Sequence, residues 1–560
     1  MEAYSAQPGI QQNSSLDKSL LDGVLGISAL ELLRNLSVWQ AIVLAVCLFI
    51  SVEALLTRQR ITVAGAPVLG YKSWLEPTFF FKLRYAWSAH KIISNGYKEY
   101  NLNDKPFVLR RQDHDVTILP NKYVTELRSI PNSKLSRGRA NFLEWGDRWA
   151  MNTLWSHSEW PIKAISENKN GQFSRYIESI RKELDHAWKV EMPQMDDWKE
   201  VDHQHIIRMI LVRIIGKMIV GEEACRTPEW LDLAENFTED FVAASLIMRL
   251  LPPVVHRLVT NIIPQRWRLR RRLKLARKIV EPIIARHNEV LKKRAQGIAV
   301  EEEECMINWI LNNADDQMQY VLDHMHIIML VILVPAAHTT AMAISNILFD
   351  LCMYPEWAPK LRAEVQATID ELGPIGQGTP VKDWVARLEI LDSFFNESQR
   401  LSQPISITPN RYAVESVTFK DGLVVPKGAL LGFVSIHNQI DPAIAPEPER
   451  FDPLRSYRKR HSDPNETTKH LAGMPSRENF AFGYGGQACP GRHIAVSVVK
   501  MVTSRLVTEY ECKSPPGRAG KPNNIYLLEF IFPDPAATIM MKKRQTKQPE
   551  KSGNGIELDN

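Results

Sequence analysis

The sequence lacks the patterns that mark several common classes of protein. Its six cysteines are scattered over 560 residues without a Cys-x-x-Cys pair, so neither a zinc site nor a disulfide framework is indicated. No Gly/Ser-rich or low-complexity linker divides the chain. The formal net charge is only +5, so composition gives no argument for a nucleic-acid partner. What remains is a large chain with 44% hydrophobic residues, enough for an extensive core.

One cysteine stands in unusual surroundings. Cys489 lies in the glycine-rich run Phe482-Gly483-Tyr484-Gly485-Gly486-Gln487-Ala488-Cys489-Pro490-Gly491-Arg492, directly before an apolar helical stretch over 494–507. The glycines let the backbone turn tightly and approach a flat ligand. The positive end of the following helix favours thiolate over thiol. A thiolate presented in this way suits the axial position of a haem iron.

A nucleotide-binding loop is the alternative for this glycine-rich run. No Gly-Lys-Ser/Thr follows it, which excludes a P-loop. The spacing Gly483-x-Gly485-x-x-Ala488 fits a dinucleotide fingerprint loosely, with Glu509 about 20 positions further on. That fingerprint must follow a strand, however, and residues 474–479 have the composition of a loop. The sequence therefore favours a haem ligand.

The pattern Phe-Gly-x-Gly-x-x-x-Cys-x-Gly resembles the signature of the haem-thiolate monooxygenases, the cytochrome P-450 superfamily. The resemblance covers about residues 60–543 and implies a mainly α fold with a minor β-sheet region. It implies haem b as cofactor and Cys489 as its axial iron ligand. The implied cofactor-binding residues are Cys489, Phe482, Gly483, Gly485, Gln487, Gly491 and Arg411.

Two further motifs precede the cysteine loop in the order that the resemblance requires. Glu397-x-x-Arg400 puts a carboxylate and a guanidinium on one helix face, and Pro448-Glu449-Arg450-Phe451 supplies a second arginine. The resemblance implies that Glu397, Arg400 and Arg450 form a buried cluster behind the loop. Alone, Glu397 and Arg400 would be an ordinary surface pair worth about 0–1 kcal/mol. The two motifs together favour the cluster.

Two positions near the expected cofactor depart from the family or admit a second interpretation. Gln487 stands where the family usually has an arginine or histidine that binds a haem propionate, so a charge-assisted contact becomes neutral. Arg411 matches another propionate-binding arginine of the family. An ordinary charge at a strand edge is the other interpretation of Arg411.

A long apolar helical stretch over 323–349 is interrupted by Pro335-Ala336-Ala337-His338-Thr339-Thr340. Proline removes a backbone hydrogen bond and kinks a helix, which opens a groove. The segment is similar to the family's Ala-Gly-x-Asp/Glu-Thr-Thr/Ser stretch, with Pro335 and His338 as departures. On this match Thr339 stands at the position of the proton-delivering alcohol, and His338 replaces the acidic residue. A shift of the alignment by one residue would give the role of the alcohol to Thr340. Otherwise the threonines simply bond back to the preceding turn.

The segment 36–56 is apolar and long enough to cross a bilayer. Residues 1–35 hold two basic and four acidic residues, whereas Arg58, Arg60, Lys72, Lys82 and Arg84 follow the segment. The positive-inside rule then places 1–35 in the lumen and the domain 57–543 in the cytosol. A buried core helix and a cleaved signal peptide are the alternatives. The resemblance implies a single-pass anchor in the endoplasmic reticulum. The charge asymmetry places the possible glycosylation sequons at Asn13 and Asn35 on the lumenal side.

Secondary structure can be predicted coarsely for the rest of the chain. Short strands are expected over 107–120, a hairpin through Asp421-Gly422 over 417–426, and mostly helix over 173–400. The run 266–278 holds eight basic residues in 13, which fits either a solvated helix face or a site for nucleic acid or acidic lipid. The tail 544–560 is polar and expected to be disordered.

The sequence is thus interpreted as a microsomal-type monooxygenase that inserts one oxygen atom from dioxygen into a small apolar substrate. Electrons would come from a separate NADPH-dependent reductase, since no flavin or nicotinamide module is evident. The His-Thr-Thr variant resembles fungal enzymes of the ent-kaurene-oxidase-like group, which oxidise terpenoids and other secondary metabolites. Two alternatives remain: a reductase-independent isomerase or dehydratase that acts on a peroxide, and a non-catalytic haem-binding protein.

Overall fold

The computed structural model describes residues 37–56, 61–73, 76–111, 114–145, 159–166, 172–251, 253–435 and 441–545. The chain divides into two compact units, one of Met1–Arg60 and Ser73–Phe81 and the other of Ile61–Lys72 and Lys82–Asn560. The sequons at Asn13 and Asn35, the segment 1–35 and the tail from residue 546 onward lie outside the described residues.

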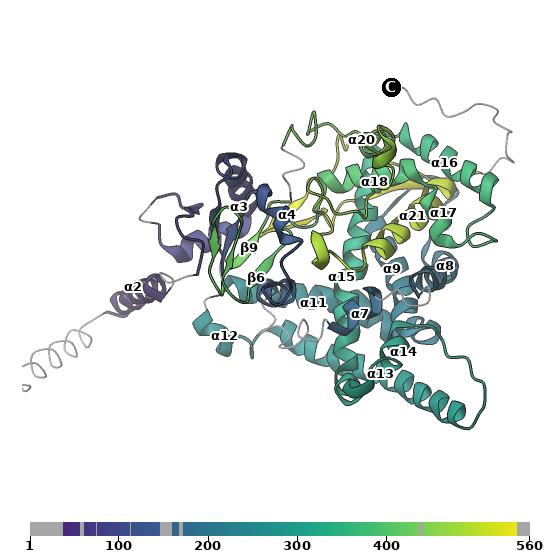
Figure 1. The fold of residues 1–560 in the computed structure, drawn as a ribbon, viewed down its shortest axis with the longest axis horizontal. Helices are drawn as coiled ribbons and strands as arrows, with labels where there is room; N and C mark the ends of the chain where they lie inside the picture. Colours follow the sequence, from purple (N-terminus) through teal and green to yellow (C-terminus); the bar gives the residue numbers. More distant parts are fainter. Residues whose placement is uncertain are drawn as a thin grey trace, which may run out of the picture. The chain divides into compact units, whose positions relative to one another are not determined.

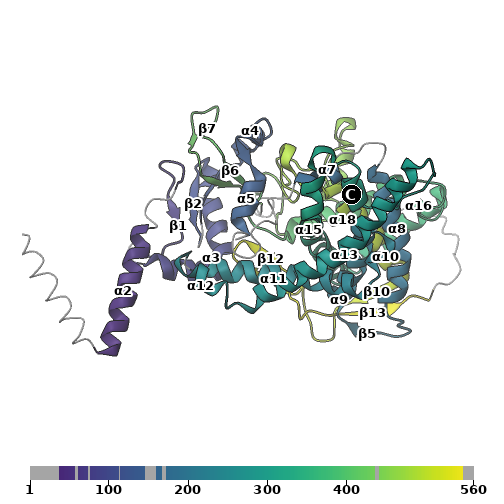
Figure 2. The same cartoon turned by 90° about the horizontal axis from the view of Figure 1, so that it is seen from below.

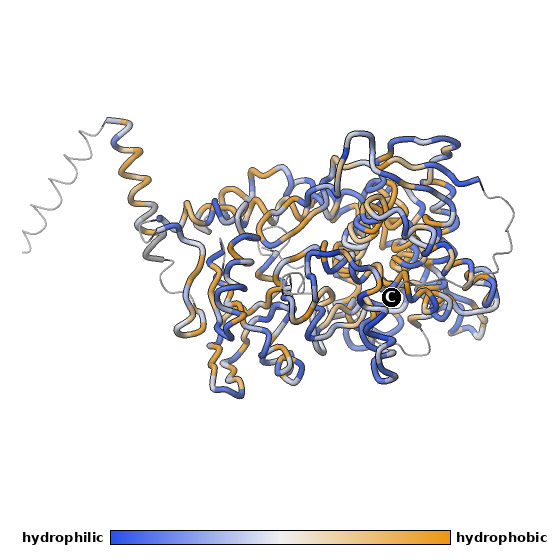
Figure 3. Tube along the Cα trace, turned by 90° about the horizontal axis from the view of Figure 1, so that it is seen from above, coloured by the Kyte–Doolittle hydropathy of each residue, from blue (hydrophilic) through white to orange (hydrophobic). Residues whose placement is uncertain are grey.

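The first unit contains α2 (Val38–Leu56), which corresponds to the apolar segment expected over 36–56. Large apolar side chains are exposed on it, among them Val38, Trp39 and Leu48, and Figure 3 shows the helix as mostly hydrophobic. Within the described part of the chain, only the stretch Asp315–Met353 is a helix long and apolar enough to cross a membrane by composition. The Val38–Leu48 part of α2 counts as a shorter apolar helix.

Helices make up most of the second unit, as the sequence predicts for 173–400 (Figure 1). The long helices are α8 (Gln172–Glu191), α9 (His203–Val220), α11 (Pro228–Leu250), α13 (Pro264–Ala295), α15 (Met318–Met353), α16 (Trp357–Leu372), α18 (Glu389–Leu401), α21 (Arg492–Glu509) and the part of α3 (Thr78–Glu99) that follows Phe81. The shorter ones are α4 (Val124–Leu127), α5 (Arg137–Glu144), α7 (Glu159–Ser166), α10 (Glu222–Cys225), α12 (Pro253–Val259), α14 (Met306–Leu311), α17 (Val381–Ala386) and α20 (Arg455–His461).

The central helix of the second unit is α15. It is apolar on nearly all sides, and a helix of that kind is stable in a protein only where other elements surround it. It packs against α9, α13, α18 and α21, and every residue from Ile328 to Val334 is buried. Its burial inside the second unit identifies α15 as a core helix, although its length and composition would also suit a membrane span.

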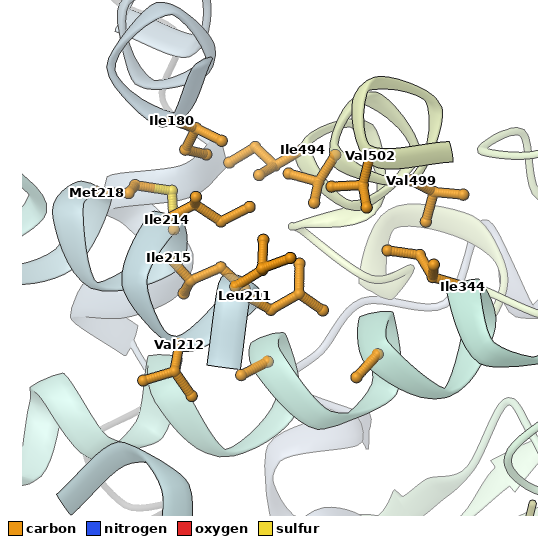
Figure 4. Close-up of a cluster of buried hydrophobic side chains, with 14 of the residues drawn as sticks. Ile180, Leu211, Val212, Ile214, Ile215, Met218, Ile344, Ile494, Val499 and Val502 are labelled. Carbon is orange, nitrogen blue, oxygen red and sulfur yellow. The ribbon is translucent and has the colours of Figure 1, made fainter. Parts of the chain in front are cut away.

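The helix that follows the cysteine loop, α21, is fixed to this core. Figure 4 shows Val499 and Val502 of α21 beside Ile344 of α15 and Leu211 and Ile215 of α9. Each of these side chains is at most 3% exposed. Burying an aliphatic side chain of this size stabilises the fold by about 1.5–3 kcal/mol. The packing holds α15 and the start of α21 in a fixed relation.

The minor β structure is also present. The main sheet has the strand order β1-β2-β3-β9-β6-β4, with strands β1 (Val68–Leu69), β2 (Phe107–Arg110), β3 (Asp115–Ile118), β9 (Leu430–Gly432), β6 (Arg411–Ala413) and β4 (Leu135–Ser136). A second sheet joins β10 (Tyr510–Lys513), β13 (Ile539–Lys543) and β5 (Lys199–Val201) (Figure 2). Two hairpins pair β11 (Ile525–Leu527) with β12 (Phe530–Phe532) and β7 (Val417–Thr418) with β8 (Val424–Val425).

These strands confirm two sequence predictions. The strands expected over 107–120 are β2 and β3, which pair antiparallel. The hairpin expected through Asp421-Gly422 is β7–β8, and Gly422 has a φ of +89°, in the left-handed region that favours glycine.

The basic run over 266–278 lies on α13 and packs against α11. Leu269 and Ala276 are buried, as expected for the apolar positions of an amphipathic helix. Arg268 and Arg272 form ion pairs with Asp240, at 3.3 and 2.8 Å. Part of the positive charge of the run is therefore paired within the protein.

Candidate active site

The loop that carries Cys489 is held by its own backbone. The N–H of Cys489 donates to the carbonyl of Phe482 (2.8 Å), and the N–H of Gly483 donates to Phe480 (2.7 Å). Gly483 and Gly485 have φ values of +75° and +70°, which glycine adopts without steric cost. A Cβ at Gly485 would also lie 3.2 Å from the Cα of Arg128. These two glycines therefore have structural reasons to be glycine.

The same loop presents a free thiol at a helix N-terminus. Cys489 forms no disulfide and is half-buried, and α21 begins three residues later, at Arg492. The guanidinium of Arg492 donates to the carbonyl of Cys489 (3.0 Å). A Cβ built on Gly486 or Gly491 meets no atom within 4 Å. The loop is therefore open at these two glycines, where a flat group could lie beside the backbone.

The expected proton-delivery segment lies in the middle of α15, at Pro335. Both hydroxyls bond back to the preceding turn: Thr339 donates to the carbonyl of Pro335 (2.6 Å) and Thr340 to that of Ala336 (2.7 Å). They differ in accessibility, since Pro335 and Thr339 are exposed while Thr340 is 5% exposed. Pro335 and Thr339 are one helical turn apart and share a face. That face of the core helix opens onto accessible space, and its accessible hydroxyl is that of Thr339.

His338 lies on the same turn but in a buried environment. Neither Nδ1 nor Nε2 has a hydrogen-bond partner among the described residues. Burial lowers the pKa of His338 from 6.5 to about 4, with a further lowering by the positive charge of Arg208. The imidazole is therefore neutral near pH 7. It can pass a proton between its two nitrogens, but it does not carry a stored positive charge.

The carboxylate cluster behind the loop is present, with one change of residue. Glu397 is 2% exposed, and its two oxygens accept from Nη2 and Nε of Arg400, at 2.8 and 2.9 Å. The N–H of Asp452 also donates to Glu397 (2.9 Å). The second arginine at this carboxylate is Arg455, with Nε 3.2 Å from Oε2.

The prediction that Arg450 completes the cluster is therefore wrong for its side chain. That side chain is 70% exposed and pairs with Glu447 at 3.0 Å. Only its backbone takes part, since the carbonyl of Arg450 accepts from Arg400 (3.2 Å) and Arg455 (3.3 Å). The physical reason is the position of Asp452: its N–H is bound to Glu397, and Arg455 then follows at the first residue of α20.

Arg411 is the first residue of β6. This strand lies between β9 and β4, so Arg411 is not on an edge strand of the sheet. Its side chain is 1% exposed. Nη1 donates to the carbonyl of Asn410 (2.7 Å) and Nη2 to that of Tyr484 (3.0 Å), while Nε has no partner among the described residues. Burial and the nearby charge of Arg137 lower the pKa of Arg411 to about 9. A buried cation bound only by carbonyls is a site that an anion would stabilise.

Gln487 differs from the sequence expectation. Its Oε1 accepts from the backbone N–H of Arg137, and its Nε2 donates to the carbonyl of Leu135, both at 2.8 Å. The side chain is thus tied to the junction of β4 and α5. Sequence reasoning overlooked Arg137, because nothing in the local pattern links it to a loop 350 positions away.

The residues present fit a haem. The loop offers one soft sulfur ligand, which is suited to iron in a haem. Arg411 of β6, which donates to the Tyr484 carbonyl of that loop, offers a buried positive charge suited to an acidic group such as a propionate carboxylate. Helix α15, which contacts α21, offers an accessible hydroxyl at Thr339.

Comparisons with known proteins show the family of the chain. A family model described as Cytochrome P450 matches residues 142–541. Cytochrome P450 monooxygenase sdnB of Sordaria araneosa is 63% identical over 525 residues, which cover 94% of this chain and 96% of that protein. Cytochrome P450 monooxygenase ATR4 of Stachybotrys chlorohalonatus is 38% identical, with 87% and 91% covered. Ent-kaurene oxidase P450-4 of Gibberella fujikuroi is 30% identical, with 86% and 93% covered.

A solved structure shares the fold. Retinoic-acid-bound cyanobacterial CYP120A1 matches with a TM-score of 0.56 and 17% identity, covering 80% of this chain and 94% of that one. At that identity the match supports the fold alone. Members of the cytochrome P450 family generally use dioxygen, a haem-thiolate centre and electrons from a reductase. On the evidence of the family model and the sequence relatives, the chain belongs to the cytochrome P450 family and is a monooxygenase of that family.

Proposed function

We propose that this chain is a membrane-anchored monooxygenase that uses Cys489 as its haem iron ligand and inserts one oxygen atom into an apolar terpenoid or meroterpenoid. The observation that carries the proposal is the free thiol of Cys489, held in a backbone-tied glycine loop three residues before α21. Haem b bound at this thiolate would supply the reductive activation of dioxygen, with the second oxygen atom leaving as water.

The loop residues prepare the thiolate and its surroundings. The bond from the Cys489 N–H to Phe482 fixes the direction of the cysteine, and the N-terminus of α21 favours its anionic form. Gly483 and Gly485 permit the turn, and the open space beside Gly491 admits a flat group. Glu397 holds this region from behind through Arg400 and Arg455.

Proton delivery is assigned to Thr339. Its hydroxyl faces accessible space and already donates to the carbonyl of Pro335, so it can accept a hydrogen bond from a water on its open side. His338 would relay protons in its neutral form. Thr340 is buried against Ala336, which favours Thr339 over Thr340.

The substrate class rests on the relatives. Several are named ent-kaurene oxidase, one of them 30% identical to this chain over 486 residues, and ent-kaurene is an apolar terpenoid. We therefore expect the substrate of this chain to be an apolar secondary metabolite, which the enzyme oxidises once or several times at carbon. Fold alone does not select the substrate.

Location and electron supply complete the proposal. The apolar and exposed α2 suits an anchor within 36–56, with 1–35 lumenal, the catalytic domain 57–543 cytosolic and 544–560 a polar tail. The proposed membrane is that of the endoplasmic reticulum, and the proposed electron donor is a separate NADPH-dependent reductase.

Turnover with and without reductase tests the function. Purified full-length protein is incubated with an ent-kaurane-type hydrocarbon, NADPH and labelled dioxygen, in the presence or absence of a fungal reductase. Reductase-dependent incorporation of one labelled oxygen atom is the expected result. Conversion of a peroxide without reductase would instead identify an isomerase or dehydratase. Neither oxygen uptake nor product across a terpenoid panel would favour a non-catalytic protein.

A further inference from the structure

The amide of Gln487 has a structural partner on a distant segment. Its two bonds, to the N–H of Arg137 and the carbonyl of Leu135, fix the plane of the amide against the start of α5. The Arg137 N–H belongs to the first turn of a helix, where backbone donors have no partner within the helix. Gln487 therefore acts as a long-range cap for α5.

This cap explains why a glutamine suits the position. An arginine carries donors only and has no acceptor for the Arg137 N–H. A family-type arginine at 487 would leave that donor without its present acceptor. It would also add a third positive charge beside Arg137 and Arg411, whose charges already interact.

Arg137 is bound to the same loop by its side chain. Its Nη1 donates to the backbone carbonyl of Gln487 (2.7 Å), just as Nη2 of Arg411 donates to that of Tyr484 (3.0 Å). Two guanidiniums are thus fastened to the cysteine loop within four residues. Among the ion pairs of the described residues, none includes Arg137 or Arg411.

Carbonyl partners orient a guanidinium without neutralising it. Burial lowers the pKa of Arg411, and the like charge of the nearby Arg137 lowers it further. Two like charges held side by side in a partly buried place are stabilised by an anion between or beside them. The anionic groups of a haem are its two propionate carboxylates.

We propose that Arg137 and Arg411 together bind the propionate edge of the haem, and that Gln487 is a positioning residue that sets Arg137 in place. The positive charge that the family usually carries at loop position 487 then comes from residue 137. This inference rests on the proposed haem site at Cys489. It changes the role of Gln487 from a direct cofactor contact to a support.

The test compares Arg137→Gln with Arg139→Gln in the full-length holoprotein. Arg139 lies on the same helix, its side chain is exposed, and its N–H is capped by Ser136 whatever its side chain. The readout is the rate of haem transfer to excess apomyoglobin. Because charge-assisted bonds are lost, Arg137→Gln should release haem about tenfold faster than the wild type. Arg139→Gln should match the wild type, and equal rates in the two variants would overturn the proposal.

A second readout separates charge from structure. Removing a positive charge beside the haem should shift the midpoint reduction potential to more negative values in Arg137→Gln, and Arg137→Lys should keep most of the wild-type potential. Recovery of holoprotein for Arg137→Lys but not for Arg137→Gln would support the proposal. Failure of both variants to bind haem would contradict it, because charge would then not be the determinant.

The positioning role of Gln487 is tested by non-additivity. Gln487→Ala should speed haem release, but adding it to Arg137→Gln should have no further effect, because Gln487 acts through the placement of the Arg137 guanidinium, which Arg137→Gln has already removed. Additive effects would show that Gln487 acts independently of Arg137. Gln487→Arg should not slow haem release, and slower release would contradict the inference. A wild type without a thiolate-type carbon monoxide spectrum would refute the haem site itself, which distinguishes the two failures.

Discussion

The carboxylate of Glu397 is bound by Arg455: Nε of Arg455 lies 3.2 Å from Oε2, with the two side chains 12% and 2% exposed. Arg450, which stands in the sequence motif Pro-Glu-Arg-Phe, points outward instead and pairs with Glu447 on the surface. The two arginines are five positions apart, and they offer a matched pair of substitutions.

Arg455→Ala should destabilise the protein far more than Arg450→Ala. Removing a partner from a buried carboxylate costs about 3 kcal/mol, whereas an exposed pair contributes about 0–1 kcal/mol. Urea unfolding of the two variants, followed by the haem content after purification, measures the difference. Equal losses, or a larger loss for Arg450→Ala, would show that the cluster uses Arg450 after all.

Thr339→Ala should keep haem binding but lower the product formed per NADPH by about tenfold or more, since a positioned proton donor is lost. The missing electrons should appear as free hydrogen peroxide. Thr339→Ser retains the hydroxyl and should restore most of the coupling. Thr340→Ala is the control and should stay coupled, because that hydroxyl is buried against Ala336; the reverse pattern would move the role to Thr340.

His338 should make the protein less stable as the pH falls. Its folded-state pKa of about 4 lies below the ordinary 6.5, so the unfolded chain binds the proton more readily between these values. The neutral imidazole makes its whole contribution to the free energy of unfolding above about pH 6.5, and this contribution is lost as the pH falls toward 4. Between about pH 7 and about pH 5 the loss from this group amounts to about 2 kcal/mol.

Urea unfolding of wild type and His338→Gln across that range measures the effect. The difference in unfolding free energy between the two proteins should shrink or change sign as the pH falls, because the variant lacks the titrating group. A constant difference over the whole range would mean that His338 has an ordinary pKa in the folded state.

The proposed membrane anchor and its orientation predict that protease can reach the rest of the chain. In intact microsomes, residues 61–560 should be digested by protease added from outside, while Asn13 is glycosylated on the lumenal side and Asn35 is too close to the membrane to be modified. Deglycosylation of wild type and Asn13→Gln, followed on a gel, provides the second check. Protection of the body or an unglycosylated Asn13 would contradict the orientation.

Local patterns predicted much of the fold and part of the site. The hairpin β7–β8 follows from Asp421-Gly422, and the Glu397–Arg400 pair follows from helical spacing, because each depends on residues close in sequence. The run from Phe482 to Gly491 likewise predicts a tight loop before a helix, as observed.

Contacts between distant segments could not be predicted from the same patterns. Arg450 lies in the expected motif and Arg455 follows it, and the pairing of Arg455 with Glu397 depends on how the chain turns after the bond from Asp452 to that carboxylate. The hydrogen bond between Gln487 and Arg137 spans 350 positions, so the sequence indicated a missing charge at 487 but not the segment to which Gln487 is bound.

The carbon monoxide difference spectrum of reduced Cys489→Ala tests the central claim most directly. Wild type and the control Cys352→Ala, which alters a half-buried cysteine in the last turn of α15, should both give the thiolate-type band. Cys489→Ala should lose that band and all reductase-dependent oxygenation. A thiolate-type band retained in Cys489→Ala would contradict the account, because the iron would then have another sulfur ligand.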